Sequence, residues 1–252
     1  MNAGPKILDL LKKVKMLPRK QMDKAEQDFV RRYLGSSKNF LGVRSSDIIR
    51  TARIFLKDNK AIDSKSLVEI LTGLFSTRTG EDHLLGGKIF TFLRPEQRQK
   101  IPLSILKKWL KQTTGWIECD VICQSAFTGL EVANRWEEWH ENISDFSRNP
   151  NIQIRRASLV LQVKSVSQVY DKRFRALAFE TIERLKPEKE VLITKAISWL
   201  LRALVNKDRD EVNKYIASSG ASLPRIAVRE TLKKIETGRK TARKGKDTLS
   251  GN

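Results

Sequence analysis

Apolar residues recur three and four positions apart along almost the whole chain of 252 residues, and this spacing constrains the fold more than any other feature. Such a period places apolar side chains on one face of an α-helix, whereas a half-buried strand needs strict alternation. The sequence has neither an extended alternation nor an Asn-Gly or Asp-Gly hairpin turn. We therefore expect an all-α fold.

Helix breakers and capping residues interrupt this pattern at short intervals. The breakers are Gly35, Pro95, Gly115, Pro150, Pro187 and Pro224, and the candidate caps are Ser46, Ser64 and Asp171. The predicted helices run near residues 6–16, 20–34, 45–58, 64–76, 80–93, 102–113, 116–129, 130–144, 151–166, 171–185, 189–206, 208–218 and 224–237. Helix pairs that repeat about every 35–45 residues are typical of a HEAT-like repeat α-solenoid, a superhelix of antiparallel helix pairs with a concave face.

The charge of the chain indicates a polyanionic partner. Lys and Arg number 49 against 29 Asp and Glu, so the formal net charge is +20. Nucleic acid, an anionic membrane surface or an acidic protein could each supply the negative charge, and nucleic acid is the partner we favour. The concave face is then expected to be basic. The sequence shows neither an apolar run of the ~20 residues needed to cross a bilayer nor a secretion signal, so we expect a cytoplasmic, nucleoid-associated monomer that does not enter membranes.

The chain divides into one helical domain and a tail. Residues 1–237 carry the apolar periodicity, and the basic first helix within them has its own apolar stripe, which predicts that it docks on the core. Residues 238–252 are basic and lack that periodicity, which predicts a disordered arm. Cys119 and Cys123 are expected to be reduced core residues, because no second cysteine pair completes a metal site. We expect no metal and no cofactor.

The segment from Glu190 to Asn206 places an aromatic residue on a polar helix face. Ile193, Ile197, Leu200 and Leu204 form the apolar stripe of this helix. Lys195, Trp199 and Arg202 fall on the opposite side. The indole could pack against a neighbouring repeat, or it could face a ligand channel in which the cations meet phosphates and the ring meets a base or sugar.

Two further helices carry charged residues in apolar surroundings. Asp120 follows Trp116 by one turn in a helix that is apolar almost all round, and it could simply pair with a Lys or cap another helix. In the segment that begins at Ile152, helical projection places Arg155 on a polar strip and Arg156 on an apolar side. An Arg in such a position usually has a fixed partner.

These segments resemble the AlkD branch of the DNA alkylation repair family, whose members are HEAT-like glycosylases that release N3- and N7-alkylated purines. The resemblance spans most of the chain. It is carried by Arg32-Tyr33-Leu34, Asn39-Phe40-Leu41-Gly42-Val43, Trp116 with Asp120, Arg156 through Gln162, Lys195 through Arg202, and Leu223-Pro224 through Ile235. Ile117 and Cys119 depart from the family pattern around the Asp.

The resemblance implies a functional cleft built from Trp116, Trp199, Asp120 and Arg156. Asp120 would stabilise an oxocarbenium-like sugar and position a water, while the alkylated purine leaves as a good leaving group. The candidate DNA-contacting cations are Arg155, Lys195, Arg202 and Lys164. The resemblance also implies action on duplex DNA containing alkylated purines without base flipping, and no compact aromatic pocket is evident in the sequence.

Two other functions remain open at this point. The chain could be a non-catalytic protein that binds bent or branched DNA, in which Asp120 serves only the fold. It could also be a scaffold for an acidic protein, since solenoids commonly bind proteins on their concave faces.

Three other tryptophans match no cleft position of the family and are predicted to be packing residues: Trp109, Trp136 and Trp139.

Overall fold

The computed structural model describes residues 3–239, and within this range the chain forms helices and no strands. The α-helices are α1 (Gly4–Met16), α2 (Lys24–Leu34), α3 (Ser45–Asp58), α4 (Ser64–Phe75), α5 (Gly80–Phe92), α6 (Pro95–Arg98), α7 (Ile105–Leu110), α8 (Trp116–Ser125), α9 (Gly129–Ala133), α10 (Trp136–Ser147), α11 (Ile152–Gln168), α12 (Lys172–Leu185), α13 (Val191–Leu204), α14 (Arg209–Ser219) and α15 (Arg225–Thr237). The predicted all-α class is confirmed.

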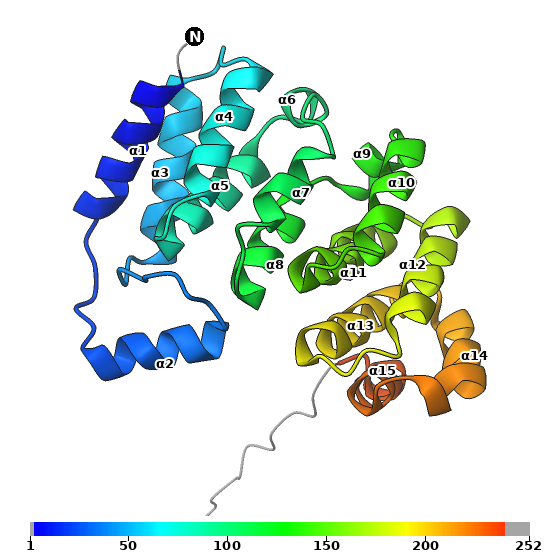
Figure 1. The fold of residues 1–252 in the computed structure, drawn as a ribbon. Helices are drawn as coiled ribbons and strands as arrows, with labels where there is room; N and C mark the ends of the chain where they lie inside the picture. Colours follow the sequence, from blue (N-terminus) through cyan, green and yellow to red (C-terminus); the bar gives the residue numbers. More distant parts are fainter. Residues whose placement is uncertain (1–2, 240–252) are drawn as a thin grey trace, which may run out of the picture.

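The helices pack as two rows that curve into an arc (Figure 1). The inner row consists of α3, α5, α8, α11, α13 and α15, each in contact with the next. The outer row consists of α1, α4, α7, α10, α12 and α14, and most of its members pack against the inner helix that follows them in sequence. This is the architecture of an α-solenoid. Helix α2 lies apart from both rows and has no buried residue.

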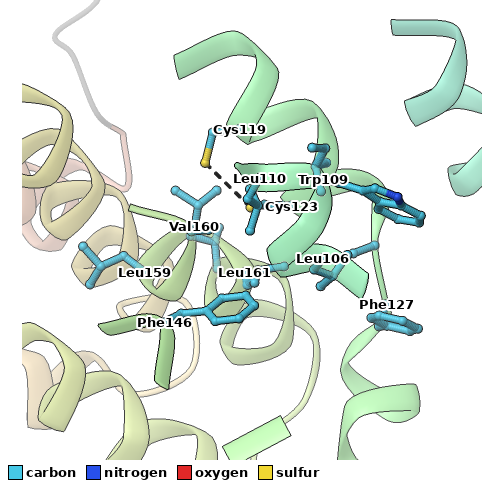
Figure 2. Packing of buried hydrophobic residues seen from close by; sticks show 14 of the residues in the cluster. Leu106, Trp109, Leu110, Cys119, Cys123, Phe127, Phe146, Leu159, Val160 and Leu161 are labelled. Atoms are coloured by element: carbon cyan, nitrogen blue, oxygen red, sulfur yellow. Dashed lines mark hydrogen bonds between the residues drawn. The ribbon is translucent and has the colours of Figure 1, made fainter. Parts of the chain in front are cut away.

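One continuous apolar cluster runs through the arc from Ala3 to Ala227. The predicted stripe of α13 is fully buried in it, and α11 is buried on almost every side because neighbours surround it. Figure 2 shows the middle of this cluster, where α7, α8, α10 and α11 meet around the two cysteines. Cys119 and Cys123 are free, buried and 3.9 Å apart between their sulfur atoms, so the prediction of reduced core residues is confirmed.

Other packing predictions are also confirmed. Leu10 and Val14 bury one side of α1, so the basic N-terminal helix docks on the core. The structure also shows a tight contact between α5 and α8, because a Cβ on Gly87 would lie 2.4 Å from the Val121 side chain of α8. Trp109 and Trp139 are buried packing residues, and Trp136 packs partly buried against the core.

Several predicted boundaries differ from the structure. Ser64 is the first residue of α4, and Asp63 is the cap that accepts from the Ser66 backbone N–H. Ser46 likewise lies inside α3, whereas Asp171 caps α12 as predicted. Pro95 begins a short helix, because the missing N–H of Pro costs nothing in a first turn. The helix predicted over 130–144 is two helices, α9 and α10.

The basic tail predicted over 238–252 lies almost wholly outside the described residues, which end at residue 239. No helix within residues 3–239 is long and apolar enough to cross a membrane.

Candidate functional site

A pocket of about 530 Å³ opens where α2, α8, α11, α13 and α15 converge. Three aromatic side chains, three cations and one carboxylate line it together with two aliphatic residues. They are Tyr33, Trp116, Arg156, Leu192, Lys195, Trp199, Arg202, Ile226 and Glu230. No aromatic pocket was evident in the sequence, because the lining residues come from segments up to about 200 residues apart. The structure corrects this expectation, since three aromatic side chains line one pocket.

The wall formed by α8 and α2 presents Trp116, the first residue of α8. The Trp116 Nε1–H donates to the Tyr33 carbonyl oxygen at 2.8 Å, and the two rings meet edge to face with centroids 6.0 Å apart. Two glycines permit this close approach. Gly35 has a φ of 62°, and a Cβ on Gly115 would lie 2.5 Å from the Gly35 carbonyl oxygen. The backbone conformation at Gly35 and Gly115 thus fixes the position of the Trp116 indole.

The facing wall belongs to α13 and α15. Lys195, Trp199 and Arg202 lie on the side of α13 opposite its buried stripe, as the periodicity predicted. Ser198 Oγ donates to Glu230 Oε2 at 2.6 Å, and Arg202 Nε lies 3.4 Å from the same oxygen. Burial lowers the pKa of the Arg202 guanidinium, and the Glu230 charge opposes that shift. The Ser198 and Arg202 side chains of α13 therefore hold the Glu230 carboxylate of α15 in place.

An ion pair joins these two walls. Arg156 Nη2 donates to Asp120 Oδ1 at 2.8 Å and to Oδ2 at 3.0 Å, and Arg156 Nε donates to Oδ1 at 3.2 Å. Arg156 Nη1 also donates to the Leu192 carbonyl oxygen at the start of α13, 2.5 Å away. The guanidinium thus links α8 to α13. The expectation that Arg156 has a fixed partner is confirmed.

Asp120 itself does not line the pocket, although its partner does. Its side chain is 15% exposed and is paired with the guanidinium. Burial raises the pKa of the Asp120 carboxyl above its ordinary value, and the adjacent Arg156 charge opposes the rise. The carboxylate is consequently an ion-paired group at the edge of the pocket rather than an open acid in its centre.

Charge inside the pocket is nearly balanced. Arg156 is paired with Asp120, and Arg202 lies beside Glu230. Lys195 is exposed and adds a positive charge. Such a site can receive an anionic backbone at Lys195 while it offers indole faces to a base or sugar. No cluster of three or more metal-ligating side chains occurs in the described range.

Two residues predicted to contact DNA lie elsewhere. Arg155 pairs with Glu188 at 2.8 Å and donates to the Asn149 and Pro150 carbonyl oxygens. The Lys164 ammonium donates to the Ala126 carbonyl oxygen, and burial lowers its pKa. Neither residue lines the pocket. Helical projection could not anticipate this, because their partners lie in the loops between helices.

Four lining residues were not predicted as site residues: Tyr33, Leu192, Ile226 and Glu230. Tyr33, Ile226 and Glu230 lie within segments that carry the family resemblance, and this was the one signal available for them. Leu192 gives no sequence signal, since it is an apolar residue near the start of an amphipathic helix.

Comparisons with known proteins agree with this architecture. The chain is similar to a solved structure described as a predicted DNA alkylation repair enzyme from Enterococcus faecalis, with a TM-score of 0.69, 19% identity, and coverage of 86% of this chain and 98% of that chain. At that identity the likeness concerns the fold. None of the curated proteins compared with the chain matches it. A family model described as DNA alkylation repair enzyme matches residues 19–235, which include every pocket-lining residue, and the chain therefore belongs to the DNA alkylation repair enzyme family.

Proposed function

We propose that the protein is a DNA glycosylase that hydrolyses the N-glycosidic bond of N3- and N7-alkylated purines in duplex DNA. The observation that carries this proposal is the convergence of Trp116 and Trp199 on a pocket that is also lined by Arg156, the residue paired with Asp120 at the pocket edge. Alkylation at either position makes the purine a cation and a good leaving group. The site then needs to stabilise a sugar with oxocarbenium character rather than to supply a strong acid.

The two indoles suit a cationic nucleotide. Their faces are electron-rich, and each cation–indole contact contributes about 0.5–2 kcal/mol. Trp116 is fixed by its bond to the Tyr33 carbonyl, and Trp199 by the rigid core beneath α13. Such fixed groups stabilise developing charge without the cost of reorganising during the reaction.

Asp120 retains acceptor capacity despite its ion pair. A carboxylate offers about four acceptor positions, and Arg156 donates three hydrogen bonds to Asp120. A water molecule bound at the remaining position would be oriented toward the anomeric carbon. Arg156 would hold the carboxylate in place, so it acts here as a positioning residue.

We propose further that the protein acts as a monomer in the cytoplasm on the nucleoid. It would reach the alkylated nucleotide in the duplex without flipping the base. The excess positive charge supports a binding mode dominated by sugar and phosphate contacts. If six to ten phosphates are contacted, affinity falls about 10³ to 10⁵-fold between 50 and 200 mM salt.

The test is release of free base. The purified protein is incubated with methylated duplex DNA without added metal or cofactor, and 7-methylguanine and 3-methyladenine are quantified. The wild-type protein should release them. Asp120→Asn should lower the single-turnover rate about 10² to 10³-fold while duplex binding is retained, since the lost group acts on the transition state.

Asp208→Asn is the matched control. Asp208 pairs with Arg175 at 2.7 Å and has a side chain 10% exposed, so it resembles Asp120 in burial and pairing, but it does not line the pocket. This variant should release base at the wild-type rate. Equal losses in the two variants would show that Asp120 serves stability alone.

The engagement of Asp120 with Arg156 favours a second candidate, a non-catalytic binder of bent or branched DNA. In that case the wild-type protein releases no base from methylated duplex, and Asp120→Asn binds branched DNA as well as the wild type does. Charge reversal at Lys195 would still abolish binding.

A further inference from the structure

A second hollow of about 210 Å³ adjoins the pocket. It is lined by Val163, Ser167, Trp199, Arg202, Ala203, Asn206 and Lys234. Trp199 and Arg202 line both spaces, so these two side chains form the partition between them. A ligand that fills the pocket beside Trp199 can therefore extend into the second hollow along the same surface of α13.

The two spaces differ in charge. Glu230 lines the pocket, whereas no carboxylate lines the second hollow among the residues the structure describes. Its polar members are a guanidinium, an ammonium, a hydroxyl and a carboxamide. Every one of these groups can donate a hydrogen bond, and two of them are cations. This donor set matches an anion with several acceptor oxygens.

Both cations have donors to spare. The Lys234 ammonium donates to the Gly238 carbonyl oxygen at 2.7 Å, which uses one of its three protons. Arg202 Nε lies 3.4 Å from both Ser198 Oγ and Glu230 Oε2, and the terminal guanidinium nitrogens donate no hydrogen bond within residues 3–239. The guanidinium is thus anchored at one end and open at the other.

We propose that the second hollow is a phosphodiester-binding subsite, in which Arg202 and Lys234 hold a backbone phosphate of the DNA strand whose nucleotide occupies the pocket. This inference rests on DNA as the ligand, and it does not require that the protein cleaves a base. Asn206 donates a further hydrogen bond to the phosphate. Trp199 then separates the nucleotide in the pocket from the neighbouring phosphate, and this fixes the position of the strand along α13.

The hollow fits a phosphate better than a peptide carboxylate. A strand that passes the partition presents its phosphate and its sugar together, and the apolar parts of Val163, Ala203 and the indole suit the sugar. The net charge of +20 supplies long-range attraction for a polyanion rather than for a single carboxylate.

The test is the salt dependence of binding to an undamaged duplex, measured by fluorescence anisotropy with the full-length protein. A plot of the logarithm of the binding constant against the logarithm of salt concentration has a slope that reports the number of phosphates neutralised. Lys234→Gln should reduce the magnitude of this slope by about 1. Lys214→Gln, on the outer row and paired with Glu211, should leave it unchanged.

A second variant tests the hollow itself. Asn206→Asp places a carboxylate beside Lys234, and we expect it to weaken binding strongly in the wild-type background but much less in the Lys234→Gln background. Such non-additivity is expected when two residues act on the same phosphate. Strictly additive losses, or a Lys234→Gln slope equal to that of the wild type, would overturn the subsite.

The result of this binding test can be distinguished from the result of the base-release test of the proposed function. If the duplex shows the reduced slope but no alkylated base is released, the subsite stands and the glycosylase proposal fails. If base is released while the slope is unchanged, the reverse holds. Thermal unfolding of each variant confirms that the comparison is made between folded proteins.

Discussion

The two walls of the pocket are held in place by different forces. On α13, Trp199 lies above a stripe of aliphatic residues that are fully buried, so the indole is supported by packing. On the opposite wall, α2 contributes no buried residue at all. The segment that follows α2 is fixed instead by buried polar groups, among them Ser36, Lys38 and Glu118.

The polar groups behind Trp116 form a connected set. Glu118 accepts from Ser36 Oγ and from the Thr114 backbone N–H, and Glu118's own carbonyl oxygen lies 3.1 Å from His83 Nε2. The Lys38 ammonium donates to the Thr77 carbonyl, and burial lowers its pKa. The support that these polar groups give to the wall of α2 and α8 depends on their protonation, whereas the apolar packing beneath Trp199 does not. The walls should therefore respond differently to charge changes and to pH.

The largest expected effect comes from removing the group that joins the walls. Arg156→Ala leaves the Asp120 carboxylate partly buried without its cation and also removes the bond to the Leu192 carbonyl oxygen. We expect the free energy of unfolding to fall by about 3–5 kcal/mol, the usual cost of breaking a buried ion pair from one side. Urea denaturation measures it.

Arg155→Ala is the control for this change. Arg155 also pairs with a carboxylate, that of Glu188, but both side chains are partly exposed and neither wall of the pocket depends on them. Its loss should be well below that of Arg156→Ala. Equal losses would mean that the walls are held independently and that Arg156 does not couple them.

A pH-dependent effect should separate the polar wall from the apolar one. Asp82 is buried on α5 near Lys38, whose charge it stabilises, and burial raises the pKa of the Asp82 carboxyl from 3.8 to about 6. Between these values the folded protein retains a proton that the unfolded chain has lost, so stability falls as pH rises through this window. The loss is at most about 3 kcal/mol. Asp82→Asn has no proton to lose.

We therefore expect Asp82→Asn to gain stability relative to the wild type as pH rises from about 4 to about 7, measured by denaturation at each pH. Leu200→Ala is the counterpart on the apolar wall. It removes a fully buried side chain and should cost about 2–5 kcal/mol at every pH. A parallel pH dependence in both variants would contradict the division into a polar and an apolar wall.

This division also explains what the sequence could predict. Periodicity was enough to place Trp199, Lys195 and Arg202 on one face of α13, because a long apolar stripe fixes the rotation of a helix. The same method judged Arg155 to be the residue facing outward toward a ligand, yet Glu188 binds it. A helical projection describes one helix alone and gives no information about the loop that covers it.

The wall formed by α2 and α8 has no long apolar stripe from which periodicity could place its residues. Tyr33 and Trp116 are 83 residues apart, and the bond between them runs to a backbone carbonyl, which any residue possesses. Glu230 reaches the pocket because α15 packs on α13, which is a consequence of the whole arc. Contacts of this kind depend on tertiary placement, so the resemblance to a family indicated these segments while the physical pattern did not.

The smallest expected effect concerns the exposed ring of Tyr33. Tyr33→Ala removes the edge-to-face contact with Trp116 but keeps the carbonyl oxygen that accepts from its indole N–H. Because Tyr33 is 66% exposed, the free energy of unfolding should fall by about 0.5–1.5 kcal/mol at most. Phe29→Ala, which removes only the ring stacked on Tyr33, should cost less. A Tyr33→Ala loss as large as that of Arg156→Ala would show that aromatic packing, rather than the polar groups behind α8, holds this wall, and the contrast with α13 would disappear.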